Sequence, residues 1–246
     1  MLIYGRHPVL EALESEDTSI RRILITRGKS GKRLQQVIDR ARQDQVPLQF
    51  EDVEVLNRKA GVKQHQDVIA ELSAIPYTDM ADLLENKPRL LLLLDGVEDP
   101  RNLGSVIRTA EAVGVEGVLL PQRGSCGITS TVVKASAGGA LHVNICRIGN
   151  LVRTMERLKG EGYWLVGLDL AGEESMNQID TASPLAVVVG GEQRGLRRLV
   201  REHCDYLVRL PMAGKLSSLN LSVAAGVLLY SIVLKRRDPQ QIDGSS

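Results

Sequence analysis

The sequence predicts an α/β protein whose larger part holds a parallel β-sheet. Apolar runs of strand length alternate with segments of helical periodicity, and the runs are apolar almost throughout. Strands of this kind are buried on both faces, as in a parallel sheet that helices cover on either side. The expected strands are 90–94, 117–120, 163–168, 185–189 and 206–210, and the expected helices are about 103–113, 129–137, 150–160, 195–202 and 218–236.

A smaller α/β unit is expected to precede this sheet. An apolar stripe at i, i+3, i+4 and i+7 begins at Leu34, and the β-rich run 22–26 comes before it. Two prolines and several polar residues then predict a linker, and the last residues are polar enough to fray. We therefore expect a first domain over 1–75, a linker over 76–89, a second domain over 90–237 and a flexible tail over 238–246.

Composition excludes several classes of protein. The chain has 246 residues and a net charge of +1, so bulk charge alone does not predict a nucleic-acid partner. The three cysteines are odd in number and far apart, which fits a reducing cytoplasm and excludes a disulfide framework. The four histidines lack metal-ligand spacing, so we expect no metal site. No apolar stretch is long enough for a membrane helix.

Three glycine-rich or polar segments each follow an expected strand. They are 102–110, 190–195 and 210–222. In an open α/β sheet, ligands bind outside the carboxyl ends of the strands. The three segments therefore predict one site at that side of the sheet.

The familiar nucleotide-binding fingerprints are missing. Gly190 and Gly195 have the spacing of a phosphate-binding loop, but Leu196 and Arg197 stand where lysine and a hydroxyl residue are needed. No Gly-x-Gly-x-x-Gly follows a strand, which argues against a dinucleotide-dependent dehydrogenase. Ser218 lacks the Gly-x-Ser-x-Gly setting of a hydrolase nucleophile.

Taken in order, the three segments resemble the motifs of the SpoU branch of the SPOUT RNA 2′-O-methyltransferases. Residues 3–9 and 65–68 resemble the substrate-binding domain of members that methylate a guanosine in large-subunit (23S) ribosomal RNA, although Asp67 stands where glycine is common. The resemblance implies a catalytic domain with a parallel sheet and a deep trefoil knot, preceded by a small α/β RNA-binding domain. It also implies S-adenosylmethionine as cofactor, ribosomal RNA as partner and a cytoplasmic homodimer.

The resemblance assigns site residues in two groups. The catalytic group is Arg108, Asn102, Glu192, Ser218 and Asn220, and the cofactor-binding group is Gly190, Gly191, Leu210, Met212 and Leu219. An arginine is a poor base because its pKa exceeds about 12, so we expect Arg108 to orient the ribose and stabilise developing alkoxide charge. Local alternatives are helix capping for Asn102 and the residues before the last helix, a favourable helix-dipole position for Glu192, and a plain core role for the leucines.

Two other functions stay open at this point. The substrate could be transfer RNA, although compact transfer RNA enzymes of the family often lack the first domain. The chain could also be a catalytically silent RNA-binding factor in ribosome assembly. Residues 21–42 carry eight cationic side chains against one acidic one, which indicates either a solvated face or a phosphate-contacting patch.

Overall fold

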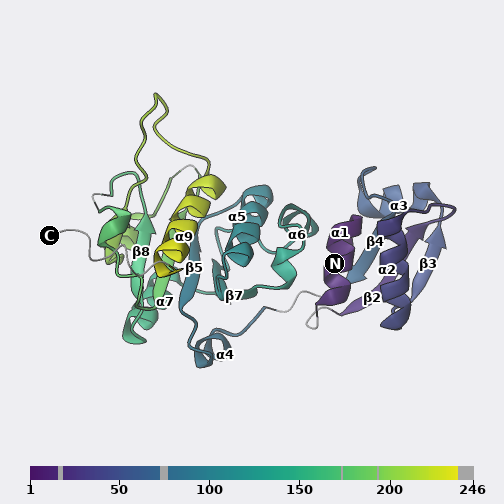
Figure 1. Cartoon of the computed structure of the whole chain (residues 1–246), viewed down its shortest axis with the longest axis horizontal. Coiled ribbons are helices and arrows are strands. Elements are labelled where there is room, and N and C mark those ends of the chain that lie inside the picture. The colour runs from purple at the N-terminus through teal and green to yellow at the C-terminus, as the bar shows by residue number, and fades with distance from the viewer. Residues whose placement is uncertain (16–18, 73–76, 173, 193, 238–246) are drawn as a thin grey trace. The chain divides into compact units, whose positions relative to one another are not determined.

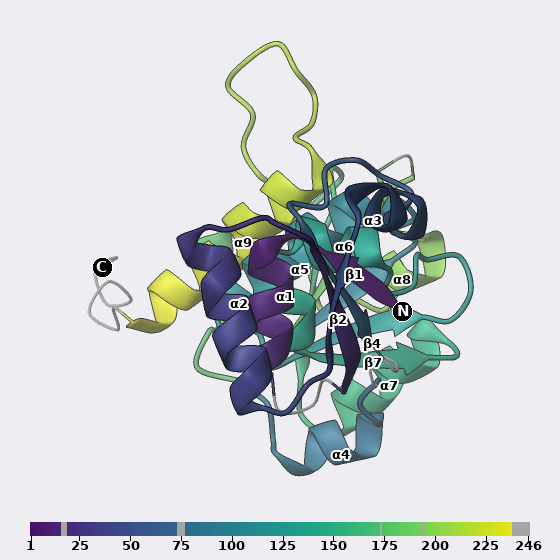
Figure 2. The ribbon, with the colours of Figure 1, turned by 90° about the vertical axis from the view of Figure 1, so that its right-hand side faces the viewer.

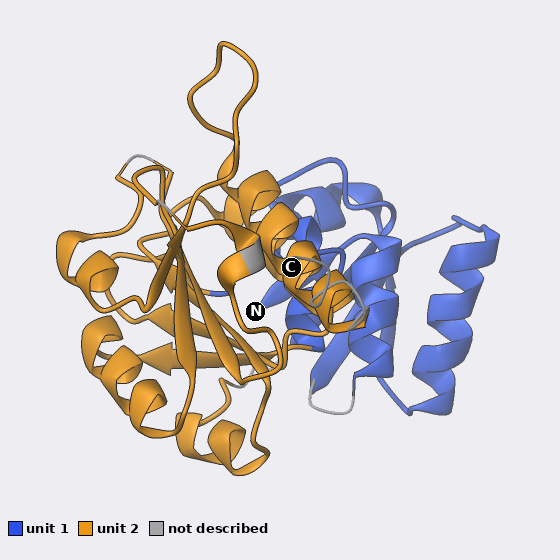
Figure 3. Ribbon diagram, turned by 60° about the vertical axis from the view of Figure 1, so that its left-hand side comes forward, with its two compact units in different colours: residues 1–76, 128–142 blue, residues 77–127, 143–246 orange. Residues whose placement is uncertain are grey.

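The computed structural model describes residues 1–15, 19–72, 77–172, 174–192 and 194–237. They form two compact units, coloured separately in Figure 3. The first unit comprises 1–76 and 128–142, and the second comprises 77–127 and 143–246. The tail expected at 238–246 lies outside the described residues.

The first unit contains a four-stranded mixed sheet. Its strand order is β1 (Leu2–Tyr4), β4 (Val68–Leu72), β2 (Ile20–Thr26) and β3 (Leu48–Glu51). Strand β4 runs antiparallel to β1 and β2, whereas β3 is parallel to β2. The helices of this unit are α1 (Arg6–Glu14), α2 (Lys32–Gln43), α3 (Val53–Ala60) and α6 (Ser130–Ala135), with a 3₁₀ turn η1 (Gly139–Leu141).

Two apolar faces hold this unit together. Helices α1 and α2 lie side by side, as Figure 2 shows, and the buried residues of α2 are the four of the predicted stripe that begins at Leu34. Leu24 of β2 packs with Leu56 of α3 and Ile69 of β4 in a separate cluster. Because side chains alternate across a strand, the neighbours of Leu24 face the other side of the sheet.

The second unit contains a six-stranded sheet in which every strand pair is parallel. Its order is β10 (Tyr206–Val208), β8 (Trp164–Leu168), β9 (Leu185–Gly190), β5 (Leu90–Asp95), β6 (Gly117–Pro121) and β7 (Asn144–Ile148). Its helices are α4 (Met80–Glu85), α5 (Pro100–Ala112), α7 (Leu151–Gly160), α8 (Arg198–Glu202) and α9 (Leu221–Arg237), with a 3₁₀ turn η2 (Met176–Gln178). Figure 1 labels all of these α-helices except α8, which Figure 2 labels.

The parallel sheet confirms the predicted α/β class. Several bounds differ from the expectation, since α8 begins at Arg198 rather than near 195 and β10 ends at Val208 rather than at 210. Strand β7 was not predicted. It is an edge strand with polar residues at two of its five positions, Asn144 and Arg147, so it does not form a continuous apolar run. Helix α9 begins at Leu221 rather than near 218, so the residues before it belong to the connection from β10. That connection is the long yellow-green loop that projects from the second unit in Figure 1.

The stretch expected as a linker contains α4. Leu83 of that helix is buried in the core of the second unit, together with leucines of β5 and Met155 of α7. Across the described residues, no helix is long and apolar enough to span a bilayer. The same residues contain no cluster of three or more histidine, cysteine or acidic side chains that could hold a metal ion.

Candidate functional site

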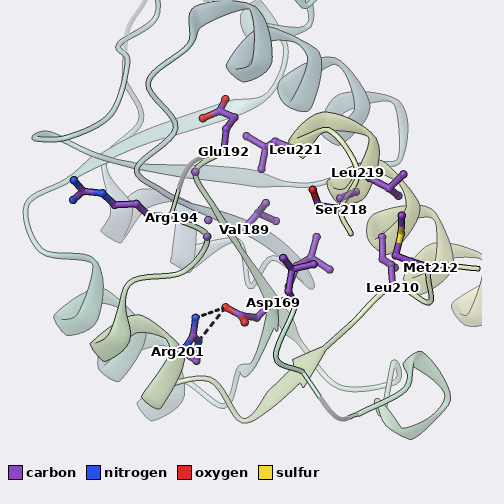
Figure 4. A pocket seen from close by; sticks show the side chains of 16 residues that line it. Asp169, Val189, Glu192, Arg194, Arg201, Leu210, Met212, Ser218, Leu219 and Leu221 are labelled. Carbon is purple, nitrogen blue, oxygen red and sulfur yellow. Dashed lines mark hydrogen bonds and ion pairs between the residues drawn. The ribbon is translucent and has the colours of Figure 1, made fainter. Parts of the chain in front are cut away.

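A cavity of about 330 Å³ lies at the carboxyl ends of β8 and β9 (Figure 4). This volume lies at the lower end of the range that small-molecule sites occupy. The lining includes all five residues expected to bind a cofactor, namely Gly190, Gly191, Leu210, Met212 and Leu219. It also includes Glu192 and Ser218 from the expected catalytic group. The fold therefore brings two of the three sequence segments to one cavity.

One side of the cavity is apolar. Leu210, Met212 and Leu219 lie together there in Figure 4, and all three come from the connection between β10 and α9. Leu210 and Met212 are half-buried and Leu219 is 41% exposed, so a plain core role does not describe these side chains. An accessible apolar wall of this kind suits a planar aromatic group.

The two glycines at the end of β9 are required by close backbone packing. A Cβ atom on Gly190 would lie 2.0 Å from the carbonyl carbon of Gly195, and one on Gly191 would lie 2.3 Å from the oxygen of Gly96. The Gly195 N–H donates to the Gly191 oxygen at 2.9 Å, which closes the turn on itself. Glycine is therefore needed so that the backbone itself can form the cavity wall.

An ion pair fixes the far end of this turn. The Asp95 side chain is fully buried at the end of β5, and Arg197 donates to it through the backbone N–H at 2.9 Å and through Nε at 2.6 Å. Asp95 and Gly190 are also partners in the register of β5 and β9. The turn is thus tied to the sheet at both of its ends, and Glu192 is held between them.

The second group of expected residues forms a chain of hydrogen bonds from three segments. The Asn102 amide Nδ2 donates to Glu192 Oε1 at 2.5 Å, and Asn220 Nδ2 donates to Asn102 Oδ1 at 3.4 Å. Asn220 Oδ1 in turn accepts from the N–H and the hydroxyl of Ser222. Motifs that lie far apart in the sequence therefore meet at one polar cluster.

The capping alternative is wrong for Asn102. Asp99 is the N-cap of α5, and its side chain accepts from the Arg101 N–H at 2.6 Å. Asn102 lies inside the first turn, so its side chain is free to bond Glu192. For Asn220, acceptance from the Ser222 N–H at the start of α9 is compatible with capping.

Arg108 stands apart from this cluster. It lies on α5, six residues beyond Asn102, which places the two side chains roughly 120° apart around the helix axis. Arg108 is exposed and forms no hydrogen bond or ion pair with any residue that the structure describes. Among the described residues, Glu192 is bonded to Asn102 and not to Arg108.

Three charged residues of the cavity lining are not among the ten expected site residues, although the sequence places Arg194 and Arg201 in a basic cluster near the predicted site. Asp169 has a side chain that is 5% exposed, and Arg201 donates to its Oδ2 from two nitrogens at 3.0 Å. Arg194 lines the cavity as well, opposite the apolar wall in Figure 4. Asp169 directly follows β8, so the strand-end rule that found the other segments would have found it too.

Two of the three cysteines of the second unit, Cys146 and Cys204, have no place in this chemistry. Burial raises the pKa of Cys204 to about 12 and that of Cys146 to about 11. A thiol with such a pKa is almost wholly protonated at neutral pH, and only the thiolate is a good nucleophile. Covalent catalysis by these two cysteines is therefore excluded.

Comparison with known families matches both parts of the chain. Residues 89–230 match the SpoU rRNA Methylase family, and residues 2–78 match the family described as RNA 2′-O ribose methyltransferase substrate binding. The 23S rRNA (guanosine-2′-O-)-methyltransferase RlmB of Pseudomonas putida is 41% identical over 241 residues, which is 96% of each chain.

Solved structures show the same architecture. The SpoU methyltransferase AviRb from Streptomyces viridochromogenes, crystallised in complex with the cofactor AdoMet, superposes with a TM-score of 0.83 and 26% identity, covering 97% of this chain and 91% of that one. A structure that describes 2-OH methylation of C/U34 on tRNA is 27% identical with a TM-score of 0.55, and it covers only 62% of this chain but 99% of that one.

Proposed function

Because the chain belongs to the SpoU rRNA methylase family, we propose that it transfers the methyl group of S-adenosylmethionine to the ribose 2′-hydroxyl of a guanosine in 23S ribosomal RNA. The observation that carries this proposal is the likeness to RlmB of Pseudomonas putida, which extends over 96% of both chains. We propose further that residues 1–75 bind the substrate RNA, that 90–237 form the methyltransferase domain, and that the reaction takes place in the cytoplasm.

The first domain favours ribosomal RNA over transfer RNA as substrate. Residues 2–78 match a substrate-binding family, whereas the transfer RNA methylation structure leaves more than a third of this chain unmatched. A silent assembly factor is disfavoured because Asn102, Glu192 and Asn220 are joined in a polar cluster next to a cavity of suitable size.

The cavity suits S-adenosylmethionine in shape and in polarity. We infer that Leu210, Met212 and Leu219 hold the adenine, while the backbone of Gly190 and Gly191 forms the opposite wall. The Asp169 carboxylate is paired with Arg201, and the Glu192 carboxylate suits a ligand that carries positive charge. When bound, the cofactor supplies an electrophilic methyl group on a sulfonium.

The residues of this chain then have to place and polarise the ribose. With the cofactor bound, the 2′-oxygen would bond to the methyl carbon, and the electron pair of the broken carbon–sulfur bond would stay on the sulfur. The hydroxyl proton would pass to the carboxylate oxygen of Glu192 that Asn102 leaves free. Glu192 keeps one carboxylate oxygen on Asn102, and its other oxygen is available to hold the hydroxyl. We propose that the Arg108 guanidinium stabilises the negative charge that develops on the 2′-oxygen. Ser218 lines the same cavity, and Asn220 donates to Asn102 beside Glu192.

The test is methyl transfer from S-adenosylmethionine to a transcribed 23S ribosomal RNA fragment, with transfer RNA as the comparison. We expect the wild-type chain to methylate the ribosomal fragment and Arg108→Ala to lose most of this activity. Equal activity of wild type and Arg108→Ala would refute the role of Arg108. Absence of transfer by the wild type to the fragment would refute the function itself.

An exposed stripe on α9 supports a homodimer. Val223, Val227, Tyr230 and Leu234 recur at helical spacing and are each between 44% and 58% exposed. An apolar stripe of this length on a surface helix is typical of a protein contact. We therefore expect Tyr230→Glu to yield a monomer in light scattering. The deep trefoil knot stays a prediction of the family resemblance.

A further inference from the structure

The carboxyl ends of three strands in the first unit meet the start of a fourth. The Gly5 N–H donates to Val68, the Thr26 N–H donates to Asp67, and the Arg27 N–H donates to Glu51, at 3.2, 3.0 and 2.8 Å. The segments that follow β1 and β2 and precede β4 are therefore neighbours. We call their six cationic residues the cationic rim, namely Arg6, Arg27, Lys29, Lys32, Arg33 and Lys63.

Ion pairs neutralise some of the cations of this domain that lie outside the rim. Away from the rim, Arg22 makes a two-pronged contact with Glu71 at 2.7 and 2.9 Å, and Arg40 is paired with Asp44 at 2.7 Å. On the rim, the side chains of Lys29, Lys32, Arg33 and Lys63 have no partner among the described residues. The basic run 21–42 is thus partly neutralised. Three of its unpaired cations, Lys29, Lys32 and Arg33, lie together on the rim, whereas Arg21 and Arg42 lie elsewhere.

The connection from β2 to α2 holds most of this charge. Every residue from 27 to 33 is exposed, and four of the seven are cationic. Arg6 reaches the same connection, since a Cβ atom on Gly31 would lie 3.5 Å from its guanidinium. Arg6 and Arg27 are each near one carboxylate, Asp67 at 3.3 Å and Asp52 at 3.7 Å. The rim as a whole keeps an excess of positive charge.

An exposed aromatic ring borders the rim. Phe50 is the single phenylalanine of the chain, and it is 44% exposed at the end of the edge strand β3. Arg27 donates to the Phe50 carbonyl at 3.1 Å, which places the two residues together. Unpaired RNA bases stack on exposed aromatic rings, and the phosphates between them bind nearby cations.

A segment with a strained backbone, Gln66 and Asp67, lies next to the rim. Gln66 and Asp67 both have left-handed backbone conformations, with φ of 55° and 66°, which residues other than glycine rarely adopt. Arg6 holds Gln66 through two hydrogen bonds of 3.0 and 3.1 Å, and the Asp67 N–H donates to His65 Nδ1 at 3.2 Å. Backbone strain of this kind clusters at functional sites. Here the hydrogen bonds from Arg6 hold the strained segment in one conformation beside the rim.

We propose that the cationic rim and Phe50 bind an unpaired segment of the substrate RNA, with phosphates on Lys29, Lys32 and Arg33 and a base stacked on Phe50. The proposal rests on the function proposed above, because it names the surface by which the first domain recognises its substrate. These contacts read the RNA backbone and the face of a base rather than its identity.

The test compares three variants of the full chain. Lys29→Gln, Lys32→Gln and Arg33→Gln are combined in the rim variant, and Phe50→Ala is made separately. Arg21→Gln, Arg40→Gln and Arg42→Gln form the control variant, with the same loss of charge. Arg40 and Arg42 lie near the other end of α2, about 12 Å and about 15 Å along the helix from Lys32. Affinity for the 23S fragment is measured by fluorescence anisotropy at several salt concentrations.

We expect the rim variant to bind at least about tenfold more weakly, with a salt dependence shallower by about 2 in logarithmic slope. Phe50→Ala should lose about 5- to 100-fold in affinity with an unchanged slope. The control should stay within about threefold of wild type. Equal losses in the rim and control variants, or wild-type affinity in the rim variant, would overturn the proposal. Both outcomes are distinct from failure of the function, in which the wild type itself transfers no methyl group.

Discussion

Asn102 and Glu192 share a hydrogen bond of 2.5 Å although 90 residues separate them in the chain. The bond follows from the order of the strands. Asn102 lies in the first turn of the helix after β5, and Glu192 lies in the turn after β9. These two strands are neighbours in register from Leu90 to Asp95. Because the two residues follow two neighbouring parallel strands, β5 and β9, they lie close together at the same end of the sheet.

This relationship predicts the effect of changing Glu192. Glu192→Gln preserves the shape and removes the charge that holds the Asn102 amide and, in our proposal, the ribose. We expect the single-turnover rate of methyl transfer to fall about 100-fold, in the range found for groups that assist proton transfer. Cofactor affinity, measured by calorimetry, should change little. Glu202→Gln on α8 is the control, and a rate equal to that of the control would contradict this role.

Asp169 predicts a different kind of defect. Asp169→Asn leaves Arg201 with a weaker partner at the cavity wall and removes a negative charge from a site for a cationic ligand. We expect cofactor affinity to fall about 10-fold, which is the size of a charge-assisted hydrogen bond. The rate at saturating cofactor should be close to that of wild type. A reduced rate with unchanged affinity would show that Asp169 serves the chemistry instead.

Gly190 predicts a loss of stability. An added methyl group would lie 2.0 Å from a backbone carbon, which cannot move without displacing the turn. We expect Gly190→Ala to cost about 2–4 kcal/mol in the free energy of unfolding, or roughly 4–16 °C in Tm. Gly160→Ala is the matched control, since a Cβ atom there meets nothing within 4 Å. Equal melting temperatures in calorimetry for the two variants would contradict the packing argument.

His65 predicts a pH dependence in the first domain. Burial lowers its pKa below the ordinary value of about 6.5, and the nearby Asp67 opposes this shift. The unfolded chain therefore binds the proton more readily, so stability is full above about pH 6.5 and is lost as the pH falls through and below it. Urea unfolding at pH 7.5 and 5.5 should show a steeper loss for wild type than for His65→Gln. Parallel losses would assign the effect to other groups.

The sequence predicted the sheet and much of the cavity for one physical reason. Buried parallel strands are apolar throughout, so their ends can be located, and the residues that follow them share one side of the sheet. This is how Gly190, Leu210 and Leu219 were expected together and were found together. Strand β7 was missed by the sequence prediction because an edge strand need not be apolar on both faces.

Other parts could not be derived from periodicity. The pairing of Asp95 with Arg197 and of Asp169 with Arg201 depends on side-chain directions that a sequence does not specify. Arg108 has the right spacing for the motif, yet its angular position on α5 turns it away from Asn102. The roles of the ten predicted site residues therefore remain predictions for the experiments above.

The division of the chain into units has a consequence for engineering. Residues 128–142 lie between two segments of the larger unit in sequence but pack with residues 1–76. A Cβ atom on Gly138 would lie 2.5 Å from the Glu11 side chain, and His142 is paired with Glu11 at 2.6 Å. In a truncated chain that starts at residue 77, residues 128–142 would lose the residues that they pack against. Val132 and Val133, which are fully buried, would lose neighbours that bury them. Grafting a different RNA-reading module onto this enzyme thus requires exchanging the insert along with the first 76 residues.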